Sequence, residues 1–147
     1  MQKETIELET LRQQIEDAEF EAGSQSDYID YGKPNEQQKK KAQEIIAQMM
    51  QKSSELKIQL QEKISIVRQN NPRAFEEWVK VHKDFLERII VEKGTGARIN
   101  LAKATLNKWE KVSAGELEYV GINWHFLKDY KAEVRKAFKK NPFQFWK

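Results

Sequence analysis

Apolar residues recur at helical spacing from the start of the chain. Leu8, Leu11, Ile15 and Ala18 are separated by 3, 4 and 3 residues, which places them on one stripe of a helix over residues 4–21. The opposite face is rich in Glu, so we expect its carboxylates to face solvent. A helix this short is not stable alone in water. We therefore expect the stripe to dock on the rest of the chain or on another protein.

The helical pattern is interrupted over residues 22–36, where two glycines and a proline stand among small polar residues. Such clusters mark loops and turns. We therefore predict a linker, and divide the chain into an acidic helical arm with its linker, residues 1–34, and a helical bundle domain with an aromatic tail, residues 35–147. Tyr28 and Tyr31 lie in this linker, either to pin it or to form a short recognition segment.

A second apolar stripe runs from residue 35 to residue 70 without Gly or Pro. A helix of this length spans about 50 Å, several times the globular average. Because one small domain rarely buries so long a stripe, the excess length predicts a surface for self-association. The spacing is close to that of a coiled coil, and the residues in the seam are Ala42, Ile46, Met49, Ser53, Leu56, Leu60, Ile64 and Val67.

Three shorter helices are predicted in the second half of the chain. The first covers residues 72–92 and has the broadest apolar face. Its short connection to the long helix predicts an antiparallel pair. The second covers residues 97–112. The third begins after Asn123, with Trp124 on its inner face, and ends before Asn141 and Pro142.

The region between the last two predicted helices is the least regular. Ser113 and Glu116 have the spacing of a capping box, so a short helical turn is expected through Leu117 and Val120. No segment has the pattern of a strand. The predicted fold class is therefore all-α: an antiparallel helical bundle of the long helix and those after it, with an N-terminal helical arm.

The amino-acid composition excludes several kinds of site and of protein. The 147 residues are 39% hydrophobic and 33% charged, and they include no Cys. Disulfides, thiolate metal sites and a Cys nucleophile are therefore excluded. The first ten residues lack the apolar core of a signal peptide, and no run approaches the roughly 20 apolar residues of a membrane helix. We expect a soluble, cytoplasmic protein that does not insert into membranes.

Charge is distributed unevenly along the chain. Residues 1–31 hold nine acidic residues against Lys3 and Arg12, a net charge of −7, so residues 32–147 carry +10 of the total of +3. Such segregation supports association between oppositely charged surfaces. Either the acidic segment lies against the basic body and neutralises it, which we favour, or it guards a basic surface that binds a polyanion.

Neither histidine belongs to a catalytic or metal-binding motif. His82 lies on the apolar face of its helix, where a core position is the simplest interpretation, and His125 adjoins the last helix. No HExxH spacing supports a zinc site. Residues 93–98 contain one GxG between two helices, which favours a turn, although Lys93 and Arg98 could attract an anion there. We predict no catalytic residue, no metal site and no cofactor.

A basic stripe lies beside the apolar stripe of the last helix. Because an aromatic tail follows it, this pattern is typical of nucleic-acid contact. It also suits the helix dipole, an anionic membrane surface or an acidic protein. The residues are Lys128, Lys131, Arg135, Lys139, Lys140 and Trp146.

The sequence favours a non-enzymatic protein–protein interaction or assembly module that acts through its amphipathic helices. The partner is either another protein or a second copy bound through the long helix. The alternative is a nucleic-acid-binding accessory protein that uses the basic stripe and aromatic tail. The residues predicted to bind a protein partner are Leu8, Leu11, Ile15, Leu56 and Leu60.

Overall fold

The regular structure of the chain is helical, and its helices pack against one another. The computed structural model describes residues 1–92 and 96–140, and within these ranges it contains no strand. The prediction of an all-α fold is therefore confirmed. The helices are α1 (Lys3–Tyr31), α2 (Glu36–Asn70), α3 (Pro72–Val91), α4 (Gly96–Ser113) and α5 (Lys128–Lys140).

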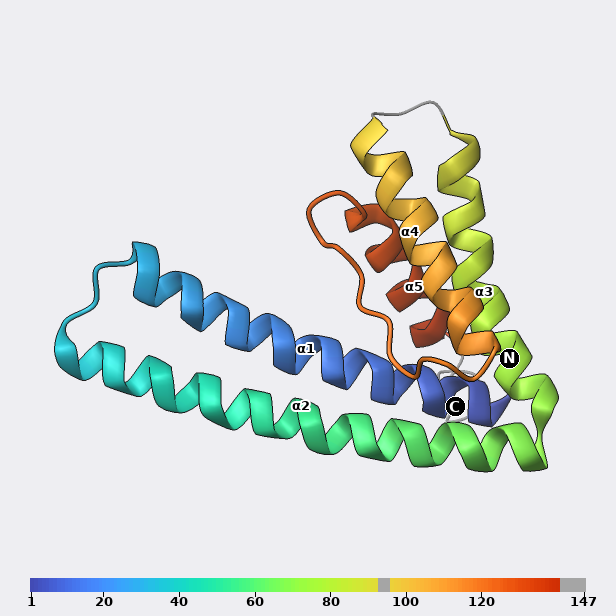
Figure 1. Cartoon of the computed structure of the whole chain (residues 1–147), viewed down its shortest axis with the longest axis horizontal. Coiled ribbons are helices and arrows are strands. Elements are labelled where there is room, and N and C mark those ends of the chain that lie inside the picture. The colour runs from blue at the N-terminus through green and yellow to red at the C-terminus, as the bar shows by residue number, and fades with distance from the viewer. Residues whose placement is uncertain (93–95, 141–147) are drawn as a thin grey trace.

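Helices α1 and α2 form a long hairpin and lie side by side along most of their length (Figure 1). This contact is formed by the two apolar stripes that the sequence predicts, one on each helix. The connection between the helices is short, since α1 ends at Tyr31 and α2 begins at Glu36. Asn35 caps the start of α2 by accepting a hydrogen bond from the Gln38 backbone N–H at 2.8 Å. The acidic N-terminal segment is thus part of a hairpin rather than a separate arm, and it lies against a more basic helix.

The predicted linker is helical as far as Tyr31, so the expectation of a loop over residues 22–31 is wrong. Ala22 is buried and Ile29 is partly buried, and this packing outweighs the weak helix propensity of the glycine between them. The helix ends at Gly32, whose N–H donates to the Tyr28 carbonyl at 2.8 Å. A Cβ at Gly32 would lie 2.6 Å from the Tyr28 ring, so only glycine fits.

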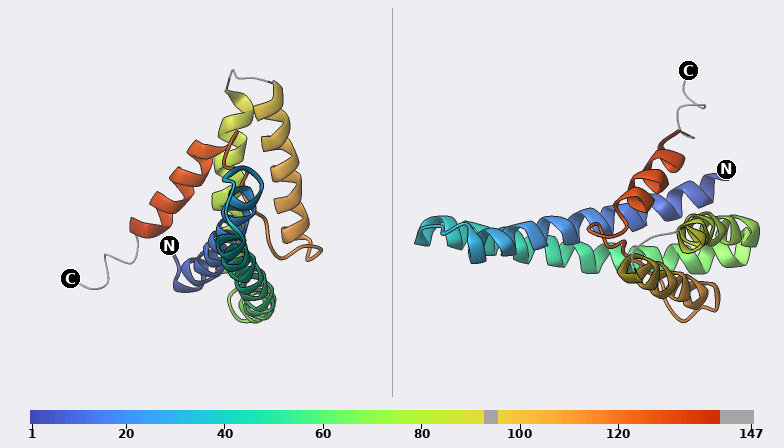
Figure 2. Two further views of the ribbon diagram at one scale, coloured as in Figure 1. Left: turned by 90° about the vertical axis from the view of Figure 1, so that its left-hand side faces the viewer. Right: turned by 90° about the horizontal axis from the view of Figure 1, so that it is seen from above.

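Helices α3, α4 and α5 stand on the end of the hairpin where α2 finishes (Figures 1 and 2). Only Asn71 separates α2 from α3, and α3 rises steeply from that point. The predicted antiparallel pairing of these two helices is therefore not what the structure shows, since α1 takes the place beside α2. Helix α3 instead contacts each of the other four helices and is the centre of the fold.

The segment between α4 and α5 departs from the sequence prediction. Ser113 ends α4 instead of capping a new helix, and no helix forms over residues 114–127. The Asn123 side chain accepts from the backbone N–H groups of His125 and Phe126, both at 3.0 Å. It caps only a single turn, because α5 begins at Lys128. Trp124, predicted to face inward, is 43% exposed.

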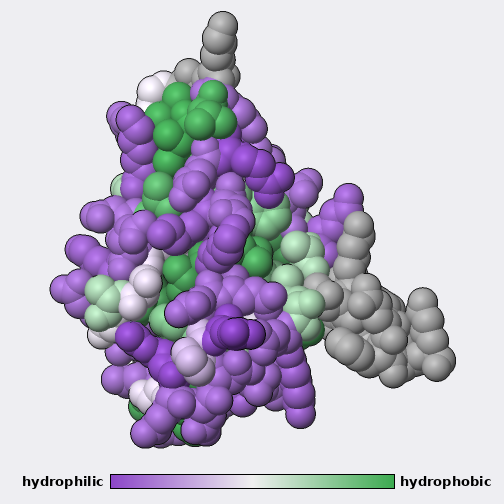
Figure 3. All heavy atoms as spheres, turned by 90° about the vertical axis from the view of Figure 1, so that its right-hand side faces the viewer, coloured by the Kyte–Doolittle hydropathy of each residue, from purple (hydrophilic) through white to green (hydrophobic). Residues whose placement is uncertain are grey.

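The core lies where α3 meets α1, α4 and α5. Trp78 of α3 and Trp109 of α4 are completely buried, and their rings meet edge to face with centroids 5.0 Å apart. Figure 3 shows that one outer face is mostly hydrophilic, with a hydrophobic patch near its upper end, where α3 finishes. No helix among the described residues is long and apolar enough to cross a membrane.

Candidate functional site

A cluster of polar side chains lies inside the core and joins α1 to α3, α5 and the segment before α5. We call it the buried polar cluster. All of its members are almost completely inaccessible to solvent. Because a buried charge is costly unless it is paired, each of these groups needs partners in the structure. The members are Glu9, Arg12, Glu16, His82 and Tyr130.

Glu9 and Arg12 form the centre of the cluster. They lie one turn apart on α1, and the guanidinium binds the carboxylate through Nε at 2.9 Å and through Nη2 at 2.9 Å. This two-pronged geometry is the strongest arrangement for such a pair. Glu9 Oε1 also accepts from the Trp78 indole N–H at 3.0 Å. The pair therefore fastens α1 directly to α3.

Arg12 and Glu16 hold the segment before α5. Arg12 Nη1 donates to Glu16 Oε2 at 2.9 Å and to the Val120 carbonyl at 3.1 Å. The same Glu16 oxygen accepts from the Ile122 backbone N–H at 3.0 Å. Glu16 Oε1 accepts from Arg135 of α5 at 3.0 Å. Side chains of α1 thus satisfy backbone groups in a segment that has no secondary structure of its own.

His82 connects Glu9 to Tyr130. Its Nε2 lies 2.6 Å from Glu9 Oε1 and its Nδ1 lies 2.7 Å from the Tyr130 hydroxyl. An ionised carboxylate can only accept, so Nε2 carries the proton, and in the neutral ring Nδ1 accepts from Tyr130. The ring also stacks on Trp109 with centroids 4.1 Å apart. The imidazole is therefore fixed on both edges and on one face.

The pKa values in the cluster follow from burial and pairing. Burial alone raises the pKa of the Glu9 carboxyl, but Arg12 and His82 outweigh it and hold that pKa well below its usual range. The pKa of Glu16 is lowered in the same way, with Arg12 overcoming burial. For His82, burial is stronger than the attraction of Glu9, so its pKa is lowered. The cluster therefore holds two carboxylates, a guanidinium and a neutral imidazole.

The order Tyr130, His82, Glu9 resembles the nucleophile, base and orienting group of a catalytic triad. Each of the three side chains is at least 99% buried, however, and each polar atom faces a protein partner. Burial also raises the pKa of the Tyr130 hydroxyl, which keeps it protonated. Glu16 and Tyr130 border surface clefts, but the polar atoms of Tyr130, His82 and Glu9 are bonded to one another. We therefore interpret the cluster as the fastening of the fold.

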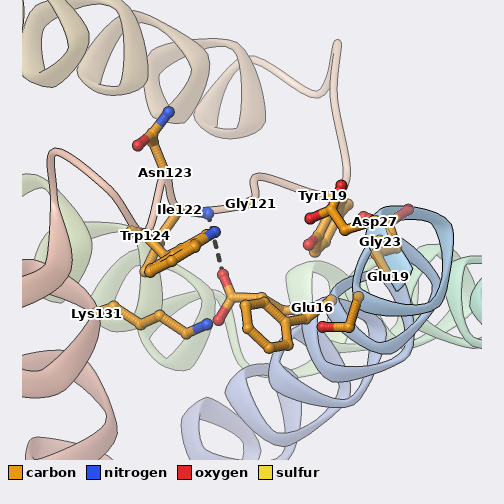
Figure 4. Close-up of a pocket in the computed structure, with 12 residues that line it drawn as sticks. Glu16, Glu19, Gly23, Asp27, Tyr119, Gly121, Ile122, Asn123, Trp124 and Lys131 are labelled. Atoms are coloured by element: carbon orange, nitrogen blue, oxygen red, sulfur yellow. Dashed lines mark hydrogen bonds between the residues drawn. The ribbon is translucent and has the colours of Figure 1, made fainter. Parts of the chain in front are cut away.

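A cleft of about 430 Å³ opens next to the cluster, between α1, residues 119–124 and α5. We call it the junction cleft. Glu16 lies at its floor, bonded to Ile122 (Figure 4). In this view Trp124 and Lys131 lie on one side of Glu16 and Tyr119 on the other. Glu16 belongs to both the buried polar cluster and the cleft, so one edge of the cluster borders an accessible surface.

The residues predicted to bind a protein partner lie in the chain's own core. Four are buried, and Leu11 is partly buried against the same core. Their stripes meet one another across the hairpin, so in this conformation they are not available to a partner. The buried four are Leu8, Ile15, Leu56 and Leu60.

The basic stripe is not one free surface. Arg135 binds Glu16 and, at 2.8 Å, Asp17 of α1. The Lys131 ammonium lies 4.9 Å from the centre of the Phe20 ring, and Lys128 is exposed. The side chains of Lys139 and Lys140, and all of Trp146, lie outside the described residues. Two of the three bases that can be placed therefore face the acidic helix α1.

Of the remaining sequence candidates, Arg98 and His82 have partners within the chain. Arg98 donates to Asp129 of α5 at 2.6 Å and 2.9 Å, while Lys93 lies outside the described residues. His82 is a core residue, as its position on the apolar face predicts, and His125 is exposed. Within residues 1–92 and 96–140, no three potential metal ligands come together.

Sequence reasoning missed the buried carboxylates, because it assigned them to the solvent face of α1. The sequence does contain one indication that these carboxylates are buried. Arg12 lies four residues after Leu8 and three before Ile15, so a charge interrupts the apolar stripe itself. A charged residue in that position needs buried partners, and Glu9 and Glu16, at three and four residues' distance, are within reach on a helix.

Removing the central cation should destabilise the fold strongly. In the variant Arg12→Met, the carboxylates of Glu9 and Glu16 stay buried without their main counter-ion, at a cost of about 3–5 kcal/mol. The control Lys57→Met removes a solvent-exposed partner of Glu19 and should cost about 0–1 kcal/mol. Urea unfolding followed by tryptophan fluorescence measures both. Equal effects of the two substitutions would show that the cluster does not fasten the fold.

Stability should decrease in acid. The pKa values of His82, Glu9 and Glu16 all lie below their ordinary values of 6.5, 4.5 and 4.5. The unfolded chain therefore binds more protons than the folded one, and the free energy of unfolding falls as the pH is lowered. The loss begins below pH 6.5 through His82 and steepens below pH 4.5 through the carboxylates.

Urea unfolding at a series of pH values measures this dependence. His82→Asn should remove the slope between pH 6.5 and 4.5 and keep the steeper loss below it. The control His125→Asn changes an exposed side chain and should keep the complete profile. If His82→Asn retains the upper slope, His82 is not held neutral by the cluster.

Comparisons with known proteins give no relative of this chain. No protein-family model matches the sequence, and no curated protein or solved structure matches it either. The arrangement of the helices, the buried polar cluster and the exposed surfaces are therefore the basis for the function proposed below.

Proposed function

We propose that the protein is a non-enzymatic interaction and assembly module, and that the far part of the α1–α2 hairpin is its binding element. We call this part, residues 22–50, the distal hairpin. The proposal is supported by one observation above all. Most of the distal hairpin projects beyond α3, α4 and α5 (Figures 1 and 2). Apart from the residues of α1 that line the junction cleft, its two helices have only each other as neighbours within the part of the chain that the structure describes.

A pair of helices without a third layer leaves apolar side chains partly uncovered. In the distal hairpin only Ala22 and Ala42 are buried, whereas the larger apolar residues are half-buried or exposed. Exposed apolar surface on a projecting element is typical of an interaction site. The larger residues are Tyr28, Ile29, Tyr31, Ile45, Ile46, Met49 and Met50.

Charge favours a second copy of the chain as the partner. The α1 side of the distal hairpin carries Asp27 and Asp30, and the α2 side carries three consecutive lysines at positions 39–41. Two hairpins placed side by side bring the acidic helix of one copy against the basic helix of the other. Such charge complementarity fixes the orientation and register of the two hairpins. In a two-fold dimer the same contact forms twice.

The test is the mass of the protein in solution as its concentration increases, measured by light scattering after size exclusion. We expect the mass to rise from 17.4 kDa toward twice that value. The variant Tyr31→Glu with Met50→Glu alters two exposed residues of the distal hairpin and should keep the protein monomeric. Its fold should be unchanged, because neither side chain is in the core.

The matched control is Ile58→Glu with Ile66→Glu, which makes the same change on exposed residues of α2 outside the distal hairpin. This variant should assemble as the wild type does. A mass that stays at 17.4 kDa at the highest concentration would contradict self-assembly, and loss of assembly in the control alone would place the contact elsewhere. The cytoplasmic location stays a prediction.

A further inference from the structure

The junction cleft has two exposed aromatic rings in its wall. Phe20 of α1 is 46% exposed and Trp124 is 43% exposed. Their rings meet edge to face, with centroids 5.9 Å apart and an interplanar angle of 79°. Both residues line the cleft. The two rings come from separate segments and form a partly exposed aromatic wall, in which His125 stacks on one face of Trp124 with centroids 3.9 Å apart.

A cation of the chain itself already lies against this wall. The Lys131 ammonium is 4.9 Å from the centre of the Phe20 ring, within the range of a cation–π interaction. Lys131 reaches the ring from α5, across the cleft from α1. The side chain therefore shows which chemistry the wall accepts, namely an ammonium group on an apolar stem.

The side chains that line the cleft and carry a charge at neutral pH are mainly acidic. They comprise Glu16, Glu19 and Asp27, all from α1, and the base Lys131. Glu16 is fully used by the buried polar cluster, and Glu19 binds Ser53 and Lys57. Asp27 has no ion-pair partner among the described residues. Its carboxylate lies toward the side of Tyr119 (Figure 4), where it can attract a cation that enters the cleft.

Gly23 leaves the α1 side of the cleft open. It lies inside a long helix, where glycine costs about 1 kcal/mol relative to alanine. A Cβ at this position would meet nothing within 4 Å, so no contact within the chain requires glycine. The missing side chain instead widens the cleft that Gly23 lines.

From these features we infer that the junction cleft is a binding site for an alkylammonium group, such as the lysine side chain of a partner peptide. The methylene stem packs along the exposed surface of the Phe20–Trp124 wall. The ammonium lies against the Phe20 ring in the place that Lys131 occupies in the free protein. Asp27 lies about two turns along α1 from Phe20, and its carboxylate attracts the cation at longer range. Lys131 is then an internal competitor that the ligand displaces. Gly23 and Asp27 of the cleft belong to the distal hairpin, but a small probe binds one copy of the chain, so the inference does not depend on self-assembly.

The test is an NMR titration of the Trp124 indole N–H with N-acetyl-lysine methylamide. N-acetyl-norleucine methylamide has a similar stem without the charge and is the matched probe. We expect a saturable shift of the Trp124 signal with the lysine probe and little change with the norleucine probe. No saturable shift with the lysine probe, or equal shifts with both, would overturn the inference.

Two pairs of variants locate the site. Gly23→Leu places a side chain in the cleft and should abolish the shift, whereas Gly23→Ala adds only a methyl group and should retain it. Lys131→Met removes the internal cation and should tighten binding by about two- to fivefold, the range of an exposed cation–π contact. Lys128→Met makes the same charge change outside the cleft and should tighten binding less.

These outcomes are independent of the mass measurement on the distal hairpin. Unchanged binding in Gly23→Leu would show that the probe binds elsewhere and would overturn the inference. The same conclusion would follow if Lys128→Met tightened binding as much as Lys131→Met, because the effect would then be one of net charge. Assembly that fails in a protein that still binds the probe would contradict the proposed function alone.

Discussion

The pairing of Arg12 with Glu9 and Glu16 is the interaction on which the rest of the structure depends. These three charges lie on consecutive turns of α1 and are buried. They bind Trp78 and His82 of α3, Arg135 of α5 and two backbone groups of the segment before α5. One helical face thus organises three parts of the chain that are distant in sequence. Because a buried charge without partners is costly, the cluster requires all of these parts to be in place together.

This constraint divides the α1–α2 hairpin into two functional parts. The near part, up to about residue 20, is fixed to α3 and α5 by the cluster. The distal hairpin has no such fastening and presents its surface outward. The junction cleft lies at the boundary, where the last residues of the cluster and the first exposed aromatic ring meet. The proposed interaction module rests on these three features: a fixed base, a projecting pair of helices and a cleft between them.

The sequence predicts the helices better than it predicts their arrangement. Periodicity identifies the stripes around Leu8 and Leu60 and the buried face of α3, since apolar spacing reports which side of a helix is covered. Apolar spacing does not identify the covering partner, so the sequence leaves open whether a stripe docks on its own chain or on another molecule. In the structure the two stripes cover each other. The loop expected at Gly23 forms a helix because contact with α2 overrides local propensity. Glu9 and Glu16 escaped notice because burial of a carboxylate depends on tertiary partners such as His82.

Native-state hydrogen exchange of the α1 backbone amides tests most directly whether the buried polar cluster makes α1 an integral part of the fold. We expect amides around Glu9, Arg12 and Glu16 to exchange only through global unfolding, with the same free energy as the most protected amides of α3. Amides beyond residue 22 should exchange with a lower free energy, because the distal hairpin can open locally. If the amides around Arg12 exchanged as readily as those of the distal hairpin, α1 would be a detachable arm and the account would be contradicted.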